Sequence, residues 1–313
     1  MADEYTLNTD IGISAMEQAF KITGRKENIV VDQAVDYNFQ EGAKTIDFVK
    51  YTSLSAVTSG LADGTDPANT AITDSKVTFT PTEYGNVCTY TTLADIGSGG
   101  KASIGTGQLV AQNLVDSSNA LFFASVSASS DSDITEIWGN DATGTGDLGA
   151  TDTVTYADLQ EAHNKLLSQA EPFDGDYYYL YVHPHVAGDL AKLDEFTGAS
   201  NIASLYANTL SGQEMVWKNY AGTIAGFRVF TSKECKLTGD GGSGTVDLYE
   251  SVACGRQAMG KAISLAPQLR VTGPYDKLGR MVHVGWYGIF AYDVVDGNGI
   301  VELKSASSYG ANS

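Results

Sequence analysis

The chain has 313 residues, of which 42% are hydrophobic and 18% are charged, and its formal net charge is −19. A chain of this length forms one large domain or two smaller ones, and it buries enough surface to fold without disulfides or metals. The negative charge argues against a nucleic-acid-binding protein, because phosphate contacts require lysine and arginine. From Ala102 to Asn164 neither of these residues occurs.

The N-terminal twelve residues are acidic and lack the apolar segment of a signal peptide, and no run approaches the ~20 apolar residues of a membrane span. We therefore expect synthesis in a cytoplasm and no membrane contact. The cysteines, Cys88, Cys235 and Cys254, are far apart and fit neither a zinc site nor a disulfide framework. We interpret them as isolated small residues of the core.

Residues 1–40 have the pattern of an arm. Ile13, Met16 and Phe20 recur at helical spacing. A helix this short is marginal in water by itself. The arm is therefore expected to rest on its own body or on another subunit.

Residues 41–96 predict a long β-hairpin. Thr45–Tyr51 and Ser75–Thr92 are rich in β-branched and aromatic residues, and the polar stretch Thr58–Asp74 separates them. Phe48 lies on one face of the first strand, and Val77 and Phe79 lie on one face of the second. Because an isolated hairpin is marginally stable, we expect this one to lie on a partner or on its own core.

A helix is predicted over about residues 105–127, where Val110, Leu114, Leu121 and Phe122 form an apolar stripe. The Gly-rich stretch Gly97–Gly107 before it contains Lys101. A phosphate-binding loop would need the lysine and a Ser or Thr directly after the final glycine, and that order is absent. We interpret this stretch as a flexible junction.

From Thr155 onwards helices and strands mix, which predicts an α+β fold. Val282–Val295 is a strand that is apolar on both faces and is therefore expected to be buried. A tight turn at Asp296–Gly299 predicts that Ile300–Lys304 returns along it. The other predicted elements are helices at Thr155–Ala170 and His185–Leu193, and strands at Tyr177–Val182, Gly226–Ser232 and Thr245–Glu250.

No pattern predicts catalysis, a metal or a cofactor. His183 and His185 flank a proline at a strand–helix junction, but a closed zinc site needs two further ligands at suitable spacing. The carboxylates of Asp131, Asp133 and Glu136 lack the spacing of a calcium loop. No G-x-S-x-G pentad is present. We expect a protein that is not an enzyme, and two alternatives stay open: a surface or secreted adhesin-type binding module, and an acidic hydrolase whose site assembles only in space.

Five segments in chain order resemble one family of tailed-bacteriophage major capsid proteins, the family of the coliphage N-four coat protein. Lys277 and Arg280 depart from that family's usual residues. The resembling segments are Phe48–Leu54, Thr82–Ile96 with its Glu83-Tyr84-Gly85 core, Tyr181–Leu193, Ile224–Ser232, and Tyr275–Ala291 with matches at Asp276, Leu278, Val284, Gly285 and Trp286.

The resemblance implies the Hong Kong 97-type capsid fold. Its parts would be an N-terminal arm at 1–40, an extended hairpin (the E-loop) at 41–96, a spine helix with the peripheral domain at 97–154, a mainly axial domain at 155–265, and C-terminal strands at 266–313 that return to the peripheral domain. The implied function is the subunit of an icosahedral phage head. Hexamers and pentamers of it would enclose double-stranded DNA in the virion, with portal and cement or decoration proteins as partners.

An assembly interface is expected along the arm, the hairpin and the C-terminal strand. The resemblance also raises a covalent crosslink from Lys50 or Lys76, which we do not expect because no partner asparagine is identifiable. The predicted interface residues are Ile13, Met16, Phe20, Phe48, Tyr51, Val77, Phe79, Tyr84 and Trp286.

Overall fold

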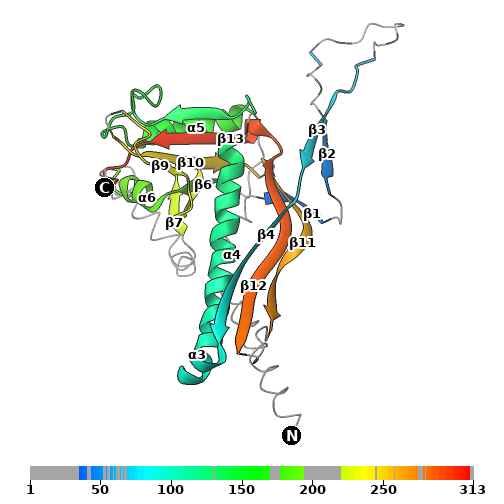
Figure 1. The fold of residues 1–313 in the computed structure, drawn as a ribbon. Helices are drawn as coiled ribbons and strands as arrows, with labels where there is room; N and C mark the ends of the chain where they lie inside the picture. Colours follow the sequence, from blue (N-terminus) through cyan, green and yellow to red (C-terminus); the bar gives the residue numbers. More distant parts are fainter. Residues whose placement is uncertain are drawn as a thin grey trace, which may run out of the picture.

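The computed structural model describes residues 35–40, 44–51, 54, 57–58, 60, 64, 66, 69–129, 131–169, 177–193, 220–243, 245–256, 258–273, 278 and 280–310. These residues form an elongated α+β molecule, which confirms the predicted class. Figure 1 shows a long helix, a slender sheet beside it, a broader sheet at one end of it, and a two-stranded hairpin that projects away from the body. The predicted arm helix at Ile13–Phe20 lies outside the described residues.

The long helix α4 spans Lys101–Ser127. It begins inside the stretch predicted to be a flexible junction, so that prediction was wrong. Gly100 has φ of 80° at the N-cap, and the Asp95 carboxylate accepts a hydrogen bond of 3.1 Å from the backbone N–H of Ser103. Asp95 belongs to the short helix α3 (Thr92–Gly97), and its carboxylate satisfies a donor at the helix start. The glycine stretch is therefore a tight corner followed by regular helix.

A four-stranded sheet runs along α4 in the order β1 (Val35–Gln40), β11 (Met259–Thr272), β12 (Met281–Val294) and β4 (Thr82–Thr91). Strand β11 was not predicted, although its burial alternates from Pro267 to Thr272 in the manner of a half-covered strand. Strand β12 confirms the predicted strand at Val282–Val295.

The predicted long return strand is two strands. β3 (Asp74–Phe79) pairs with β2 (Ile46–Tyr51), whereas β4 pairs with β12. Thr80 and Pro81 separate β3 from β4, and proline removes the N–H that a continuous ladder needs. The predicted hairpin is therefore confirmed for its outer part, and its inner part belongs to the four-stranded sheet.

The broader sheet follows the order β5 (Thr135–Trp138), β13 (Ile300–Ser305), β10 (Leu248–Cys254), β6 (Tyr178–Val182), β8 (Phe227–Thr231) and β7 (Tyr220–Ile224), and the short β9 (Leu237–Thr238) pairs with β10. The prediction that Ile300–Lys304 returns along the previous strand was wrong. After the 3-10 turn η1 (Gly297–Gly299), β13 enters this second sheet between β5 and β10. Its side chains are almost all buried, so it needs neighbours on both sides.

Helices α5 (Tyr156–Ser168) and α6 (Pro184–Leu190) cover one face of the broader sheet, near the predicted positions. The side chain of Thr155 accepts from the backbone N–H of Asp158, and the Asp158 carboxylate accepts from the N–H of Thr155. This reciprocal cap satisfies two donors at the start of α5.

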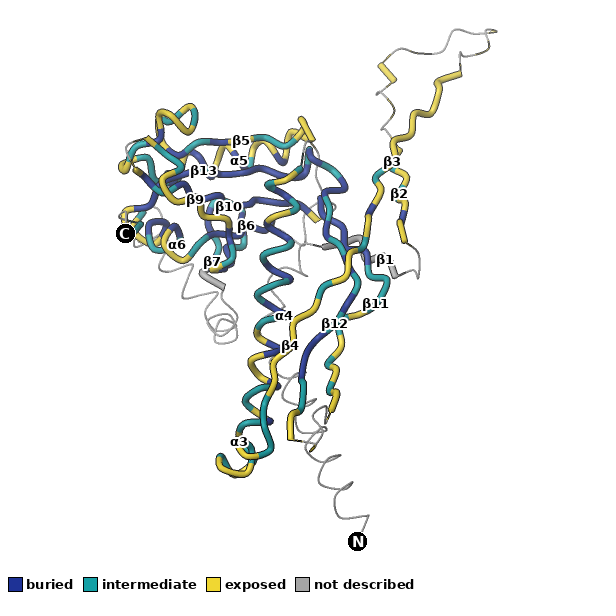
Figure 2. Tube along the Cα trace, in the orientation of Figure 1, coloured by how far each residue is buried: buried dark blue, intermediate teal, exposed yellow. Residues whose placement is uncertain are grey.

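The other face of the broader sheet packs against the C-terminal half of α4, where one core unites both sheets. Phe122 lies at its centre, with ring centroids 5.7 Å from Tyr181 of β6 and 5.9 Å from Tyr292 of β12. Phe123 lies 6.0 Å from Tyr181, and Phe290 lies 6.1 Å from Tyr292. Figure 2 shows buried segments concentrated where α4 meets the two sheets. We call Phe122, Phe123, Tyr181, Phe290 and Tyr292 the aromatic joint.

A charged network lies beside the aromatic joint. Lys304 Nζ is 2.6 Å from Glu136 Oε1 and 3.3 Å from Glu302 Oε2. Glu250 binds Lys236 at 2.9 Å and accepts a hydrogen bond of 2.8 Å from Ser127, the last residue of α4. Burial raises the pKa of Glu302, and Lys304 opposes that effect only in part. The hydrogen bond from Ser127 to Glu250 ties the end of α4 to the broader sheet.

Substitution Phe122→Ala should destabilise the subunit by about 3–5 kcal/mol, because the ring is fully buried between α4 and both sheets. Urea unfolding of the isolated subunit measures this. The matched control is Leu109→Ala on the same helix, whose side chain is 64% exposed and should cost little. Equal losses for the two variants would contradict a central role for the aromatic joint.

Substitution Glu302→Gln should change how stability depends on pH. Burial raises the pKa of the Glu302 carboxyl in the folded state above its value in the unfolded state. The ionised carboxyl therefore lowers the free energy of unfolding at pH values above the folded-state pKa. This loss disappears at pH values below the unfolded-state pKa. The variant should therefore gain stability relative to the wild type as the pH rises through this window. Denaturant unfolding at a series of pH values measures the difference, with the exposed Glu161→Gln as the control that should show none.

Candidate assembly surfaces

The base of the hairpin is fixed to the body by a small apolar core. Phe79 and Ile46 are buried against Ala262 of β11 and Val295, which follows β12. Gly260 makes room for the ring, since a Cβ there would lie 2.6 Å from Phe79 Cζ. The direction in which the hairpin leaves the subunit is therefore set by packing at its base.

Ion pairs hold the stem of the hairpin. Lys50 Nζ lies 2.7 Å from Asp296 Oδ1 of the body, and Lys76 Nζ lies 2.7 Å from Asp47 Oδ2 on the opposite strand. The hydrogen bonds from Lys76 and from Thr78 lower the pKa of Asp47. Both lysines that were considered for a crosslink thus have carboxylate partners inside the same chain, and the absence of a crosslink stays a prediction.

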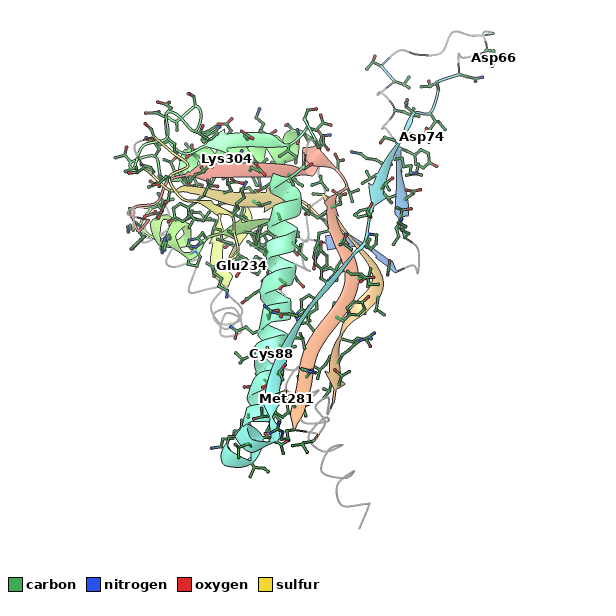
Figure 3. The ribbon with its side chains drawn as sticks, viewed as in Figure 1. Asp66, Asp74, Cys88, Glu234, Met281 and Lys304 are labelled. Atoms are coloured by element: carbon green, nitrogen blue, oxygen red, sulfur yellow. The ribbon has the colours of Figure 1, made fainter. Side chains whose placement is uncertain are left out.

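At the end of the stem and beyond it, the hairpin exposes apolar side chains. Tyr51 is 68% exposed and Ile72 is 73% exposed, and Leu54 and Val57 are exposed as well. Figure 3 places Asp74 at the end of the stem and Asp66 at the far tip, well away from Lys304 in the broader sheet. These apolar groups project into solvent, where the rest of the described subunit offers them no cover. We call Tyr51, Leu54, Val57 and Ile72 the hairpin patch.

A second exposed apolar group lies at the opposite end of the molecule. Leu93 and Ile96 of α3 are 82% and 74% exposed. Leu278 is exposed nearby in the chain segment that leads into β12, and Met281 begins that strand beside Thr91. Met281 is labelled at this end in Figure 3. We call Leu93, Ile96, Leu278 and Met281 the lower-end patch.

The lower-end patch was missed by the sequence analysis. Leu93 and Ile96 fell in the predicted hairpin region 41–96, between the strand that ends at Thr92 and the junction that begins at Gly97, so the short helix that displays both on one surface was not predicted. A helical spacing of three residues after the N-cap Thr91 was the available signal. Six residues are too few to separate such a helix from a turn by periodicity.

The nine predicted interface residues occupy different environments. Tyr51 is exposed, whereas Phe48, Val77 and Tyr84 are half-buried. Phe79 and Trp286 are buried inside the subunit, and the Trp286 indole N–H donates to Asn113 Oδ1 at 2.9 Å. Contacts of Phe79 and Trp286 with another subunit would therefore be indirect. Ile13, Met16 and Phe20 lie outside the described residues.

Of the two histidines considered for a metal, His183 caps a helix and His185 lies in its first turn. His183 precedes α6, and its Nδ1 accepts a hydrogen bond of 3.2 Å from the backbone N–H of His185. His185 Nδ1 lies 2.9 Å from the Tyr249 hydroxyl. Burial lowers the pKa of His183, and the neighbouring His185 lowers it further. Within the described ranges, no group of three or more His, Cys, Asp or Glu side chains is arranged to hold a metal ion.

The described part of the chain contains no helix that is both long and apolar enough to cross a membrane. Its three cysteines are free: Cys235 and Cys254 are buried as expected, whereas Cys88 is exposed on β4. The expectation that all three lie in the core was therefore wrong for Cys88. It lies on β4, an edge strand of the four-stranded sheet, and the described residues place no further strand beside it.

No protein-family model and no curated protein matches the sequence. Solved structures do match its fold over almost the whole chain. The capsid of Ralstonia phage GP4 has a TM-score of 0.70 at 13% identity and covers 88% of each chain. The capsid of cyanophage Pam1 has a TM-score of 0.61 at 16% identity, covering 88% of this chain and 89% of that chain.

A virus-like particle from Pyrococcus furiosus also matches, with a TM-score of 0.52 at 10% identity, covering 92% of this chain and 97% of that chain. At such identities the likeness concerns the fold. The fold implied by the sequence resemblance is thus confirmed at its coarse level, and the chain has the Hong Kong 97-type fold of tailed-phage major capsid proteins.

Proposed function

We propose that this chain is the major shell subunit of a tailed-phage head and assembles into the hexamers and pentamers of an icosahedral capsid. The observation that carries the proposal is the hairpin: it is anchored firmly at its base, yet it holds apolar side chains away from its own subunit. The likeness of the whole chain to capsid subunits supports it.

The physical argument starts from the marginal stability of a lone hairpin. The stem of β2 and β3 gains support from Phe79 and from the Lys50–Asp296 ion pair. Neither contact covers the hairpin patch, and a large exposed apolar group marks an interaction site in a soluble protein. A neighbouring subunit that covers Tyr51 and Ile72 would remove this exposure.

The lower-end patch supplies a second contact at the other end of the molecule. Surfaces at opposite ends of an elongated subunit let each copy touch several others, as a closed shell requires. Leu93 and Ile96 are 82% and 74% exposed, and α3 has no buried residue, so neither side chain contributes to the subunit's own core. Modest contacts of this kind, repeated around a shell, add to a large total buried area.

The negative net charge of the chain is compatible with a shell that encloses DNA. A net charge of −19 disfavours tight binding to phosphates, so packaged double-stranded DNA would be enclosed without being bound tightly. We propose the virion as its location, synthesis in the host cytoplasm, and portal and cement or decoration proteins as further partners. A structural role of this kind requires no catalytic group.

We also propose the finer assignment of the parts. The first part is membership in the coat-protein family of coliphage N-four. The second part is the division into arm, E-loop, spine, axial and peripheral regions, with the boundaries expected from the sequence. The β2–β3 hairpin is the counterpart of the E-loop, and α4 is the counterpart of the spine helix. The five resembling sequence segments are the basis for the family.

Deletion of Thr58–Asp74 should leave the subunit folded and prevent stable shells, because it removes the outer hairpin while Phe79 and Ile46 stay in place. Circular dichroism checks the fold, and electron microscopy with light scattering of the purified protein checks assembly. Normal shells from the deleted chain, beside normal shells of the wild type, would contradict the proposed role of the hairpin.

The double substitution Leu93→Ser with Ile96→Ser should weaken shell formation without changing the melting temperature of the isolated subunit. Both side chains are largely exposed, so replacing them removes no internal packing. Sedimentation velocity measures the assembled fraction. Leu167→Ser on α5 is the matched control, since this exposed leucine lies on the broader-sheet domain, and an equal loss for the control would argue against a specific contact.

A further inference from the structure

A cavity of about 320 Å³ opens at the foot of the hairpin, between β3, α4 and β12. It exists because β4 follows β12 only as far as the pair Thr82–Phe290, after which the chain diverges through Pro81 into β3. The side chains that matter for its chemistry are Thr78, Tyr84, Ser125, Tyr292 and Asp293. Its volume is at the lower end of the roughly 300–1,000 Å³ of ligand pockets.

Asp293 gives the cavity a carboxylate without a countercharge. Its Oδ1 accepts a hydrogen bond of 2.8 Å from the backbone N–H of Val294, and it forms no ion pair with any side chain that the structure describes. Lys261 on the adjacent strand directs its ammonium group over the Tyr292 ring, 5.1 Å from the centroid. Burial raises the pKa of Asp293, and the hydrogen bond from Val294 opposes that effect only in part.

The remaining walls also suit a cation. The rings of Tyr84 and Tyr292 line the cavity, and aromatic faces attract ammonium and guanidinium groups. The hydroxyl of Thr78 donates to Asp47, and that of Ser125 donates to the carbonyl of Phe122, so both hydroxyl oxygens can still accept. One carboxylate, two rings and two acceptors are the chemistry of a lysine or arginine site.

The sequence holds a suitable donor segment. Lys21, Arg25 and Lys26 form the densest basic run in this acidic chain, and they precede β1. Lys26 and Lys21 stand nine and fourteen positions before Val35, so an extended chain would carry them roughly 30–45 Å from the start of β1. That reach is long enough to leave the subunit.

The strand order of the four-stranded sheet favours a second copy of the chain as the source of the basic side chain. β1 and β4 form opposite edges of that sheet, and Tyr84 of β4 lines the cavity. The chain's own basic run would have to pass around the sheet to reach Asp293, whereas a neighbouring subunit can approach that edge directly. We propose that the Asp293 cavity receives a lysine or arginine side chain from residues 21–26 of a second copy of this chain. The proposal rests on the proposed function, because it describes one contact between shell subunits.

The first test is a binding measurement that does not depend on shells. A fluorescent peptide of residues 19–28 is titrated into the full chain carrying Lys21→Gln, Arg25→Gln and Lys26→Gln, in which the cavity has no competing arm. Adding Asp293→Asn, which keeps the acceptor for Val294, should weaken peptide binding about tenfold, the scale of one partly buried charged contact. The control Asp141→Asn should leave binding unchanged, since Asp141 lies in an exposed loop. Equal binding with and without Asp293→Asn, or no binding at all, would overturn the proposal.

The second test separates a neighbour's arm from the chain's own arm. Chains with Asp293→Lys, and chains with Lys21→Glu, Arg25→Glu and Lys26→Glu, should each assemble less than the wild type. Mixing the two kinds of chain should restore assembly, because the reversed charges meet only between subunits. Assembly that returns only in a chain carrying all four substitutions, and stays absent in the mixture, would mean that the arm reaches the cavity of its own chain. That result would overturn a second copy as the source. If the wild type forms no shells, the proposed function fails, and the peptide titration still decides whether the cavity binds the basic run.

Discussion

The packing of Phe122 between two sheets is the constraint on which the rest of the subunit depends. Its ring contacts Tyr181 of the broader sheet and Tyr292 of the four-stranded sheet, so one side chain of α4 belongs to both halves of the molecule. Because interiors are close-packed, the angle between the halves follows from this contact. The position of the hairpin at one end and of the lower-end patch at the other is set through the same helix.

Rigidity at the centre and exposure at the ends go together in this chain. The base of the hairpin is held by Phe79 in the core and by Lys50 on Asp296, and the apolar side chains of the hairpin patch are exposed past these contacts. A surface that is held in place loses less entropy when it meets a partner. The same argument applies to Leu93 and Ile96, which α3 presents beside the start of α4.

Charge has different roles inside and outside the subunit. Within the chain, Glu250 pairs with Lys236, Lys304 pairs with both Glu302 and Glu136, and burial favours the neutral form of Glu302. Outside, the excess of carboxylates disfavours nonspecific binding to DNA. Asp293 lies between these cases, since it is half-buried and without an ion pair in the described part of the chain, which makes it suited to a cation from a neighbour.

The sequence by itself determined the α+β class, the long helix, the strand at Val282–Val295 and the outer part of the hairpin, because each has a local periodicity or a turn signal that its own residues carry. It also placed Val77 and Phe79 on one face of the second hairpin strand. Only the tertiary structure decided that β4 leaves the hairpin for β12, that β13 crosses to the broader sheet, and that Phe79 and Trp286 are internal. Strand partners and burial depend on contacts between residues far apart in the chain, such as Val284 with Cys88, and no local pattern contains them. The Asp293 cavity has the same origin, since it arises where two distant strands part.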